Sequence, residues 1–356
     1  MKNGNKNIII LLSFPGASAK MIAFGLLALV AFSGVFSASV PFHPLSDEYI
    51  DHINSLQTTW KAGRNFPKDM PLSHIKRRLG VLESENTENL QTVHHVKADD
   101  EVIPDTFDAR EQWPSCESIR LIRDQSDCGS CWAVSSAAAM SDRICISSNG
   151  TDQTLVSDED LMSCCSKCGN GCGGGYPNRA WEYWQKTGIV SGGPYNSTTG
   201  CRAYSLPPCE HDGTPGSLPQ CDPKGYDTPE CVRSCDKGST LSYKESKTYA
   251  VEAYTITGNV EQIQLEILKY GPVAATFLVY TDFLSYKTGV YHETSFNYVG
   301  KHAVRVIGWG EENNVPYWLV ANSWNEDWGD KGIFKIRRGT DECRIEKEIS
   351  AGLPRL

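Results

Sequence analysis

The first 102 residues contain no cysteine, although the whole chain of 356 residues has 14. The chain is also short of positive charge, with 34 Lys and Arg against 43 Asp and Glu and a formal net charge of −9. A broad basic face for nucleic acid is therefore not expected. Hydrophobic residues make up 40% of the chain and charged residues 22%. This composition is close to the globular average and excludes wholesale disorder.

Several familiar catalytic and binding motifs are missing. The sequence has no G-x-S-x-G, H-E-x-x-H or G-x-x-x-x-G-K-[ST] pattern, so these serine hydrolase, zinc protease and P-loop motifs are not indicated. The glycine-rich stretch 169–175 holds two cysteines and lacks the spacing of a dinucleotide-binding loop. We expect neither a metal nor a cofactor.

An uncharged apolar run follows Lys20 and extends from Met21 to about Val40. The preceding positive charge and the small residues at the end of the run, Ser37–Ser39, are typical of a signal peptide, which we assign to residues 1–39. A transmembrane anchor is the alternative, because the run approaches the ~20 residues that span a bilayer. Met21 could itself be the start. A signal peptide places the chain in the secretory pathway, lysosomal or extracellular, without stable membrane insertion.

Residues 40–102 contain two amphipathic stretches, Ser46–Trp60 and Leu72–Leu82, and then a polar, acidic stretch, Glu83–Glu101. Ser46 is a good N-cap for a helix. The polar stretch has no apolar period and resembles an exposed linker that is open to proteolysis. Composition alone supports two interpretations equally, namely a removable pro-segment and a small helical domain with a linker.

The run Asp127-Cys-Gly-Ser-Cys131-Trp opens a segment in which small and apolar residues occur on nearly every side. This pattern predicts a buried central helix that begins at Cys131. The N-terminus of a helix favours an anion and lowers the pKa of a thiol, so Cys131 is a candidate thiolate nucleophile. The alternative is one half of a disulfide. If Cys131 is free, a second cysteine must also be unpaired, and the isolated Cys343 is the candidate.

A thiolate nucleophile needs a base, and three histidines follow Cys131: His211, His292 and His302. His302 opens one predicted strand, and Asn322 ends the next. Antiparallel pairing about a turn centred on residue 312 places these two side by side. An Asn carbonyl can then accept from the imidazole and fix its tautomer. The geometry favours His302 over the other two.

At this point the sequence resembles the papain-like (C1) cysteine peptidases, most closely those of the cathepsin B type. The resemblance covers about residues 41–356 and implies an α+β, papain-like fold of two lobes, with a helical lobe, a barrel-like antiparallel sheet lobe and an occluding-loop insertion. It rests on matches to the active-site, propeptide and mature N-terminal motifs, at Gln125–Trp132, Lys301–Ala303, Ala321–Asn325, Ser46–Glu48, Thr59–Phe66 and Asp108–Trp113.

The resemblance implies a role for each matching residue. Cys131 is the nucleophile, His302 the acid and base, and Asn322 the residue that orients His302. The Gln125 side chain and the Cys131 backbone N–H form the oxyanion hole. The remaining matches are to substrate-binding residues: Gly174, Gly175, Trp324, Glu348 and His211. Among them, Glu348 matches the base of the pocket for the second residue before the cut, where it would admit a basic side chain.

The resemblance also implies partners and covalent features. The partners are protein and peptide substrates, the chain's own propeptide as inhibitor, and cystatin-type inhibitors. The sequons at Asn149 and Asn196 are candidate glycosylation sites. The implied disulfides are Cys116–Cys145, Cys128–Cys172, Cys164–Cys231, Cys165–Cys168, Cys201–Cys235 and Cys209–Cys221.

The implied boundaries are a propeptide at 40–102, a mature peptidase at 103–356 and an occluding loop at about 209–221. We expect a zymogen that is opened by acid and cut near Val102–Ile103. Two departures fall in the loop, because Asp212 replaces the second of two histidines and Leu218 replaces an arginine. A carboxylate there would repel a substrate C-terminus, so we expect endopeptidase activity with weakened removal of dipeptides.

Three other functions stay open on the sequence alone. A thiol–disulfide oxidoreductase would use Cys128 and Cys131 as a C-x-x-C pair. A zinc or disulfide-framework binding module would be built on the cysteines between 164 and 172. An inactive peptidase homologue would act only as a binding protein.

Overall fold

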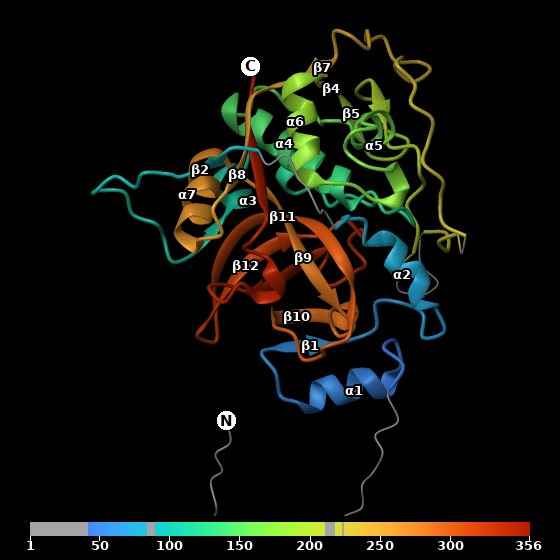
Figure 1. The fold of residues 1–356 in the computed structure, drawn as a ribbon, viewed down its shortest axis with the longest axis vertical. Coiled ribbons are helices and arrows are strands. Elements are labelled where there is room, and N and C mark those ends of the chain that lie inside the picture. The colour runs from blue at the N-terminus through green and yellow to red at the C-terminus, as the bar shows by residue number, and fades with distance from the viewer. Residues whose placement is uncertain (1–41, 84–89, 211–217, 223) are drawn as a thin grey trace, which may run out of the picture. The chain divides into compact units, whose positions relative to one another are not determined.

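The computed structural model describes residues 42–83, 90–210, 218–222 and 224–356. The assigned signal peptide, His211 and Asp212 therefore lie outside the described residues. Within the described part of the chain, no helix has the length and apolar character needed to cross a membrane. Seven α-helices and one large sheet make up most of this part (Figure 1).

The helical lobe is built on α4 (Cys131–Ser147), α5 (Asp158–Cys164) and α6 (Pro177–Lys186). Nearly every side chain of α4 is buried, as the sequence predicts, because small residues allow close packing on all of its sides. A separate apolar core fills this lobe and includes Met140, Leu161, Trp181 and Trp184. Two small sheets flank it: β4 (Ile189–Val190) with β7 (Lys247–Thr248), and β5 (Gly192–Gly193) with β6 (Arg202–Ala203).

The sheet lobe is a ten-stranded, mostly antiparallel sheet that curls around its own apolar core (Figure 1). Nine strands run in one order, and β3 pairs with β11 off this path. The strands in that order are β1 (Trp60–Ala62), β10 (Tyr286–Tyr291), β13 (Ile333–Arg337), β12 (Val315–Ala321), β11 (Tyr298–Glu312), β9 (Val273–Tyr280), β14 (Ile349–Pro354), β8 (Ala250–Ile256) and β2 (Thr92–Val93), with β3 at Phe107–Asp108. The two-lobed α+β fold is thus confirmed.

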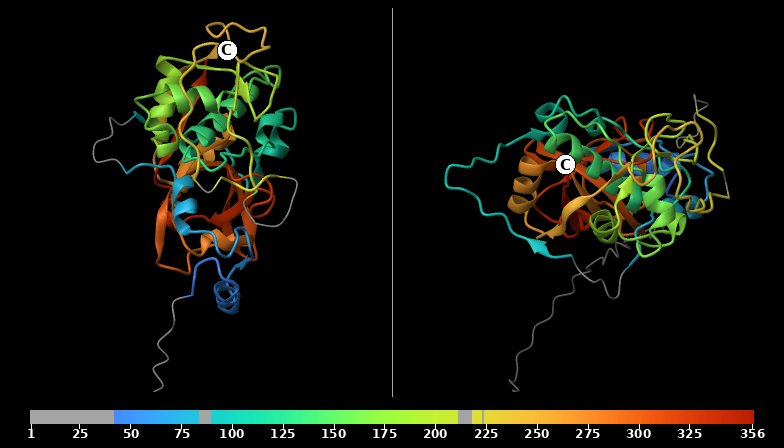
Figure 2. Two further views of the ribbon diagram at one scale, coloured as in Figure 1. Left: turned by 90° about the vertical axis from the view of Figure 1, so that its right-hand side faces the viewer. Right: turned by 90° about the horizontal axis from the view of Figure 1, so that it is seen from above.

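The other helices lie around these cores. They are α1 (Asp47–Ser55), α2 (Leu72–Arg78), α3 (Ala109–Gln112), α7 (Val260–Tyr270) and the 3₁₀ helices Glu117–Ile119, Gly171–Gly173, Phe283–Ser285 and Glu342–Arg344. Of these, α1, α2 and α7 add to the core of the sheet lobe the side chains of Ile53, Ile75, Ile263 and Ile267. Ser46 caps α1 by accepting a hydrogen bond from the Tyr49 N–H at 3.1 Å, as expected. Figures 1 and 2 both show α2 beside the junction of the two lobes.

The stretch Glu83–Glu101 is not only a linker, and the prediction is wrong for part of it. Thr92 and Val93 form β2, which pairs in parallel with β8 at the edge of the sheet. His95 then contacts the buried carboxylate of Glu266, with 2.5 Å between His95 Nε2 and Glu266 Oε2. These contacts are made by backbone groups and by one polar side chain. They therefore leave no periodic pattern of apolar residues from which the sequence could predict them.

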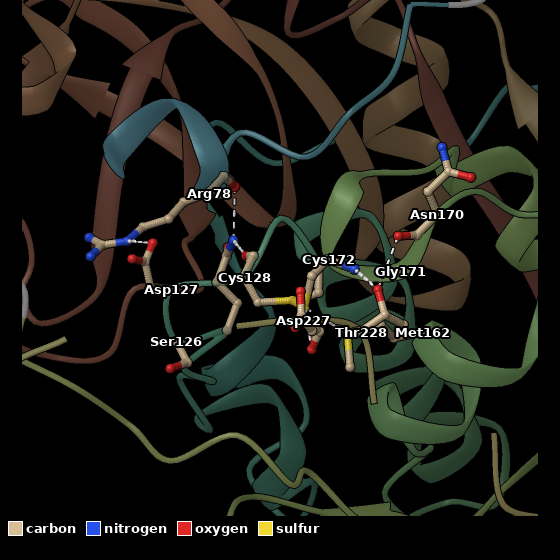
Figure 3. Close-up of a disulfide and its surroundings, with 12 residues drawn as sticks. Arg78, Ser126, Asp127, Cys128, Met162, Asn170, Gly171, Cys172, Asp227 and Thr228 are labelled. Carbon is tan, nitrogen blue, oxygen red and sulfur yellow. Dashed lines mark hydrogen bonds and ion pairs between the residues drawn. A yellow bond between two sulfur atoms is a disulfide. The ribbon is translucent and has the colours of Figure 1, made fainter. Parts of the chain in front are cut away.

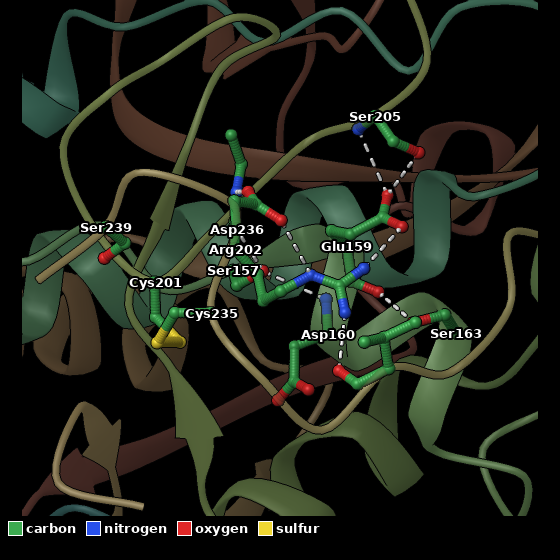
Figure 4. A network of polar contacts seen from close by, with 12 residues as sticks. Ser157, Glu159, Asp160, Ser163, Cys201, Arg202, Ser205, Cys235, Asp236 and Ser239 are labelled. Carbon is green, nitrogen blue, oxygen red and sulfur yellow. Dashed lines mark hydrogen bonds and ion pairs between the residues drawn. A yellow bond between two sulfur atoms is a disulfide. The ribbon is translucent and has the colours of Figure 1, made fainter. Parts of the chain in front are cut away.

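All six disulfides have the pairing that the resemblance implies, and Cys131 and Cys343 are free. The loop region 201–236 contains two of these bridges, and a third, Cys164–Cys231, joins it to α5. Polar contacts also join this region to α5 (Figure 4). Arg202 lies 3.4 Å from Glu159 and 3.3 Å from Asp236, and Glu159 accepts a hydrogen bond from the Ser205 hydroxyl at 3.0 Å. Buried charge pairing of this kind holds the base of the loop region in place.

Candidate active site

Cys131 is the first residue of α4 and is fully buried. It packs with Val81 and with Ala303, the neighbour of His302 in β11. Its sulfur accepts a hydrogen bond from the Gly80 N–H at 3.2 Å. Burial raises the pKa of the thiol to about 11, which outweighs the backbone N–H groups that favour the thiolate. In this closed form, Cys131 is therefore a protonated thiol.

His302 and Asn322 are hydrogen-bonded, with 2.8 Å between His302 Nε2 and Asn322 Oδ1. The other ring nitrogen, Nδ1, is buried and has no hydrogen-bond partner among the described residues. The Trp324 ring lies over the imidazole, with 4.8 Å between the centroids. Burial lowers the pKa of His302 to about 4, so the ring is neutral near pH 7. Asn322 thus fixes one nitrogen and leaves Nδ1 available to a reacting group.

The register of the β11–β12 hairpin differs from the sequence expectation by two residues. Ala321 pairs with Arg305, whereas a turn centred on residue 312 would pair it with Ala303. The turn lies at Asn313 and Asn314, which both have positive φ, and the register also shifts between Val306 and Gly308. The expected hydrogen bond still forms, because diagonal neighbours on one sheet face lie within reach of long side chains.

Gln125 holds its side-chain amide in one orientation. Its Oε1 accepts from the Ser323 hydroxyl at 2.6 Å, and its Nε2 donates to the carbonyl oxygens of Arg78 and Cys128 at 2.8 and 2.7 Å. The sequence analysis missed Ser323, although it lies between the two predicted site residues Asn322 and Trp324. Its hydroxyl directs the Gln125 N–H groups toward the position that the Arg78 carbonyl now occupies.

Gly174 and Gly175 pair with the segment Gly80–Leu82 through their backbones. The Gly175 N–H donates to the Gly80 oxygen at 2.9 Å, and the Leu82 N–H donates to the Gly175 oxygen at 3.1 Å. Gly174 has a φ of 101°, and a Cβ on Gly175 would lie 2.6 Å from the Trp132 ring. Only glycine fits this pair of positions, as the resemblance implies.

Glu348 lies in a cavity of about 510 Å³ that Leu82, Tyr176 and Thr276 also line. Lys301 contacts both carboxylate oxygens of Glu348 at 2.7 Å. The cavity therefore lies next to Tyr176, which follows the glycine pair in the sequence. The Glu348 carboxylate in it already has a cationic partner, Lys301.

Asp127 lies two residues after Gln125 in the sequence, and the sequence analysis assigned it no role. Its carboxylate accepts from Arg78 at 3.2 Å (Figure 3). It also accepts from Arg77 at 2.9 Å, and it is almost fully buried. The adjacent Cys128 is bonded to Cys172 in the same view. Two ion pairs thus hold the C-terminal end of α2 next to Gln125.

The fold agrees with the comparisons. Residues 103–353 match the papain family cysteine protease domain, and residues 45–85 match the peptidase family C1 propeptide. The chain belongs to the papain family of cysteine proteases. Residues 45–85 are therefore its propeptide.

Within this family the chain is a cathepsin B-like cysteine proteinase. It is 49% identical to cathepsin B-like cysteine proteinase 4 of Caenorhabditis elegans, over 89% of this chain and 95% of that protein, and 48% identical to a cathepsin B-like cysteine proteinase of Schistosoma japonicum, over 87% and 91%. The solved procathepsin B S9 of Trypanosoma congolense is similar with a TM-score of 0.76 and 36% identity, over 88% of this chain and 99% of that one.

The thiol–disulfide oxidoreductase alternative is wrong, because Cys128 is bonded to Cys172 and no redox pair with Cys131 exists. The zinc form of the binding module is also wrong, because the cysteines 164, 165, 168 and 172 are all in disulfides. The disulfides of a disulfide framework are present, but they belong to a chain of the papain family of cysteine proteases. The sequon residues Asn149 and Asn196 are both exposed, and their glycosylation stays a prediction.

Proposed function

We propose that this protease is an endopeptidase in which Cys131, His302, Asn322 and Gln125 carry out peptide hydrolysis. One observation carries the assignment: the propeptide backbone contacts both Cys131 and Gln125, where a substrate backbone would lie. Gly80 N–H contacts the Cys131 sulfur at 3.2 Å, and the Arg78 carbonyl accepts from Gln125 Nε2 at 2.8 Å. A scissile carbonyl in that second position would have its developing negative charge stabilised.

The reaction follows from this geometry. Once the propeptide leaves, His302 Nδ1 takes the thiol proton, and the Cys131 thiolate attacks the carbonyl carbon. The oxyanion accepts from Gln125 Nε2 and from the Cys131 backbone N–H. His302 then donates its proton to the leaving amine, and water hydrolyses the thioester. Asn322 keeps the imidazole aligned through the 2.8 Å hydrogen bond, and Trp324 covers the pair.

The propeptide blocks this site in the direction opposite to a substrate. Phe66, which comes earlier in the propeptide, contacts Trp324 on the leaving-group side of the site, with 5.8 Å between the ring centroids. Its later residue Leu82 pairs with Gly175, which would bind substrate residues before the cut. A reversed backbone puts no peptide carbonyl in the correct orientation for attack, so we infer that the propeptide inhibits without being cut here.

A test of the function is hydrolysis of an unfolded protein by the acid-treated chain. We expect internal cleavage that a thiol-alkylating reagent abolishes. Cleavage that resists alkylation, or the absence of any cleavage after complete removal of the propeptide, would overturn the proposal. Internal cleavage that alkylation abolishes would also exclude the third alternative, an inactive homologue that only binds.

Acid should open the zymogen. The pKa of His302 in the closed form, about 4, lies below its ordinary value of 6.5, so protonation at a pH between these values opposes the closed state. The docking free energy contributed by this group is fully present above pH 6.5 and decreases by up to about 3 kcal/mol toward pH 4. Incubation at about pH 4.5 and N-terminal sequencing should reveal a new terminus near Ile103; no shortening with full activity would contradict this.

Removal of C-terminal dipeptides should be weak. Asp212 and Leu218 stand in the occluding loop, which Cys209–Cys221 closes, where the family's residues would favour a substrate carboxylate. His211, if it binds that carboxylate, has a neighbouring negative charge to oppose it. We expect a peptide with a free C-terminus to be cut no faster than its amidated form. A strong preference for the free acid, measured as kcat/KM, would show the expectation to be wrong.

The remaining proposals follow from the class of protein. We infer a mature enzyme of residues 103–356, passage through the secretory pathway to a lysosomal or extracellular location, and inhibition by cystatin-type proteins that enter the same site. Detection of the chain in medium or in lysosomal fractions would separate the two locations.

A further inference from the structure

Lys301 and Glu348 form a close ion pair inside the cavity next to the glycine pair. The Lys301 amine lies 2.7 Å from each carboxylate oxygen of Glu348, so both oxygens are engaged by one cation. The Thr276 hydroxyl donates a further hydrogen bond to Glu348 Oε2 at 2.9 Å. Glu348 is therefore held from two sides by residues of β11 and β9.

The pair is only partly open to solvent. The Lys301 side chain is 12% exposed and that of Glu348 is 52% exposed. The backbone of Lys301 is held in β11 by its pairing with Leu278 of β9, which does not involve the propeptide. Because this pairing and the Thr276–Glu348 hydrogen bond both lie within the mature segment, the amine stays near the carboxylate when the propeptide leaves.

The cavity gains a net positive charge when the propeptide leaves. The described residues that line it include four charged groups, namely Glu83, Lys301, Lys347 and Glu348. Glu83 belongs to the segment before the predicted cut and leaves with it. Two lysines then face one glutamate, and the cavity carries a net positive charge.

We propose that Lys301 makes this pocket reject basic side chains at the second residue before the scissile bond. The inference rests on the proposed function, which gives the cavity that role. An arginine that enters the pocket meets a carboxylate that is already neutralised and an amine of its own sign. Apolar side chains still pack on Tyr176 and the neighbouring apolar lining, and an acidic side chain meets two lysines. The expectation from Glu348 alone, that a basic residue is admitted, is thereby reversed.

The experiment uses the mature enzyme and three peptide substrates that differ only in that residue: Phe, Arg or Glu. The quantity compared is the ratio of kcat/KM for Arg to that for Phe within each variant. The wild type should cut the Phe peptide at least ~10 times faster than the Arg peptide, and Lys301→Met, which keeps most of the stem, should raise the Arg-to-Phe ratio by ~10-fold or more. The Glu peptide should lose rate in Lys301→Met.

Two further variants make the test specific. Glu348→Gln combined with Lys301→Met should lose the gain for Arg, since no free carboxylate remains, whereas a pocket that had merely widened would keep it. Lys335→Met is the matched control, because it removes a lysine that pairs with Glu312 outside this cavity, and it should shift the ratio by less than about threefold. A wild type that prefers Arg, or a Lys301→Met ratio within threefold of wild type, overturns the inference.

Failure of the inference can be told from failure of the proposed function. If the wild type cuts the Phe peptide and a thiolate-specific peptidyl electrophile labels Cys131, but Lys301→Met leaves the ratio unchanged, only the role of Lys301 is wrong. If no peptide is cut and Cys131 is not labelled in the mature enzyme, the peptidase assignment and the pocket inference both fall.

Discussion

Cys131→Ala should abolish peptide hydrolysis, with a decrease in kcat of at least ~10⁴-fold. Ser130 carries the hydroxyl nearest to Cys131 in the sequence. It does not replace the thiol as nucleophile, because it is hydrogen-bonded to the Tyr204 hydroxyl at 2.8 Å. The oxyanion donors and the substrate contacts remain, so substrate binding should persist. The measurement is hydrolysis of a peptide substrate after an added acid protease has removed the propeptide and has been inactivated at neutral pH.

Cys343→Ala is the matched control for this prediction. Cys343 is the other free cysteine, it is also buried, and burial together with Glu342 and Glu293 raises the pKa of its thiol. A thiol in that environment is inert. The control should keep kcat within about threefold of wild type. More than 1% of wild-type activity in a folded Cys131→Ala protein, judged by thermal unfolding, would refute the assignment of the nucleophile.

Arg78→Met should release the active site of the uncut zymogen. Arg78 is fully buried, its Nε donates to Asp127 at 3.2 Å, and its guanidinium lies 5.7 Å from the Phe66 ring centroid. Burial lowers its pKa, and the Asp127 carboxylate counteracts this by favouring the charged form. Removal of one partner from a buried pair costs about 3–5 kcal/mol, which corresponds to an increase of ~10²–10⁴-fold in the population of the open form.

The rate at which a peptidyl electrophile labels Cys131 in the intact zymogen at neutral pH measures this change. Labelling of Arg78→Met should be at least ~100 times faster than labelling of the wild type, provided that open and closed forms exchange rapidly. Lys97→Met is the control, because Lys97 pairs with Glu261 at 3.6 Å on the surface, and an exposed pair is worth little. Labelling of Arg78→Met within threefold of wild type would show that the buried pair does not hold the zymogen closed.

Local chemistry made several features predictable from the sequence. The position of Cys131 at the start of a helix follows from the run of small and apolar residues after it, and α4 begins at that residue. The contact of His302 with Asn322 follows from two apolar runs separated by a turn. Each prediction needs only residues near one another in the chain or one hairpin, so composition and spacing are enough.

The register of the β11–β12 hairpin was not predictable from the sequence. The pairing is displaced by two residues because the turn is at Asn313–Asn314 and an extra residue enters between Val306 and Gly308. A bulge of this kind depends on how β11 bends to pair with β9, β12 and β3 together, and one strand's sequence does not reveal it.

By itself the sequence determined the class of chemistry, the order of propeptide and peptidase, and the residues matching a nucleophile, a base and an oxyanion donor. Only the tertiary structure decided which charges meet. Asp127 pairs with Arg77 and Arg78 some fifty residues earlier, and Glu348 pairs with Lys301 across the sheet. The physical reason is that the energy of a charge depends on its burial and its nearest partner, and both are set by folding.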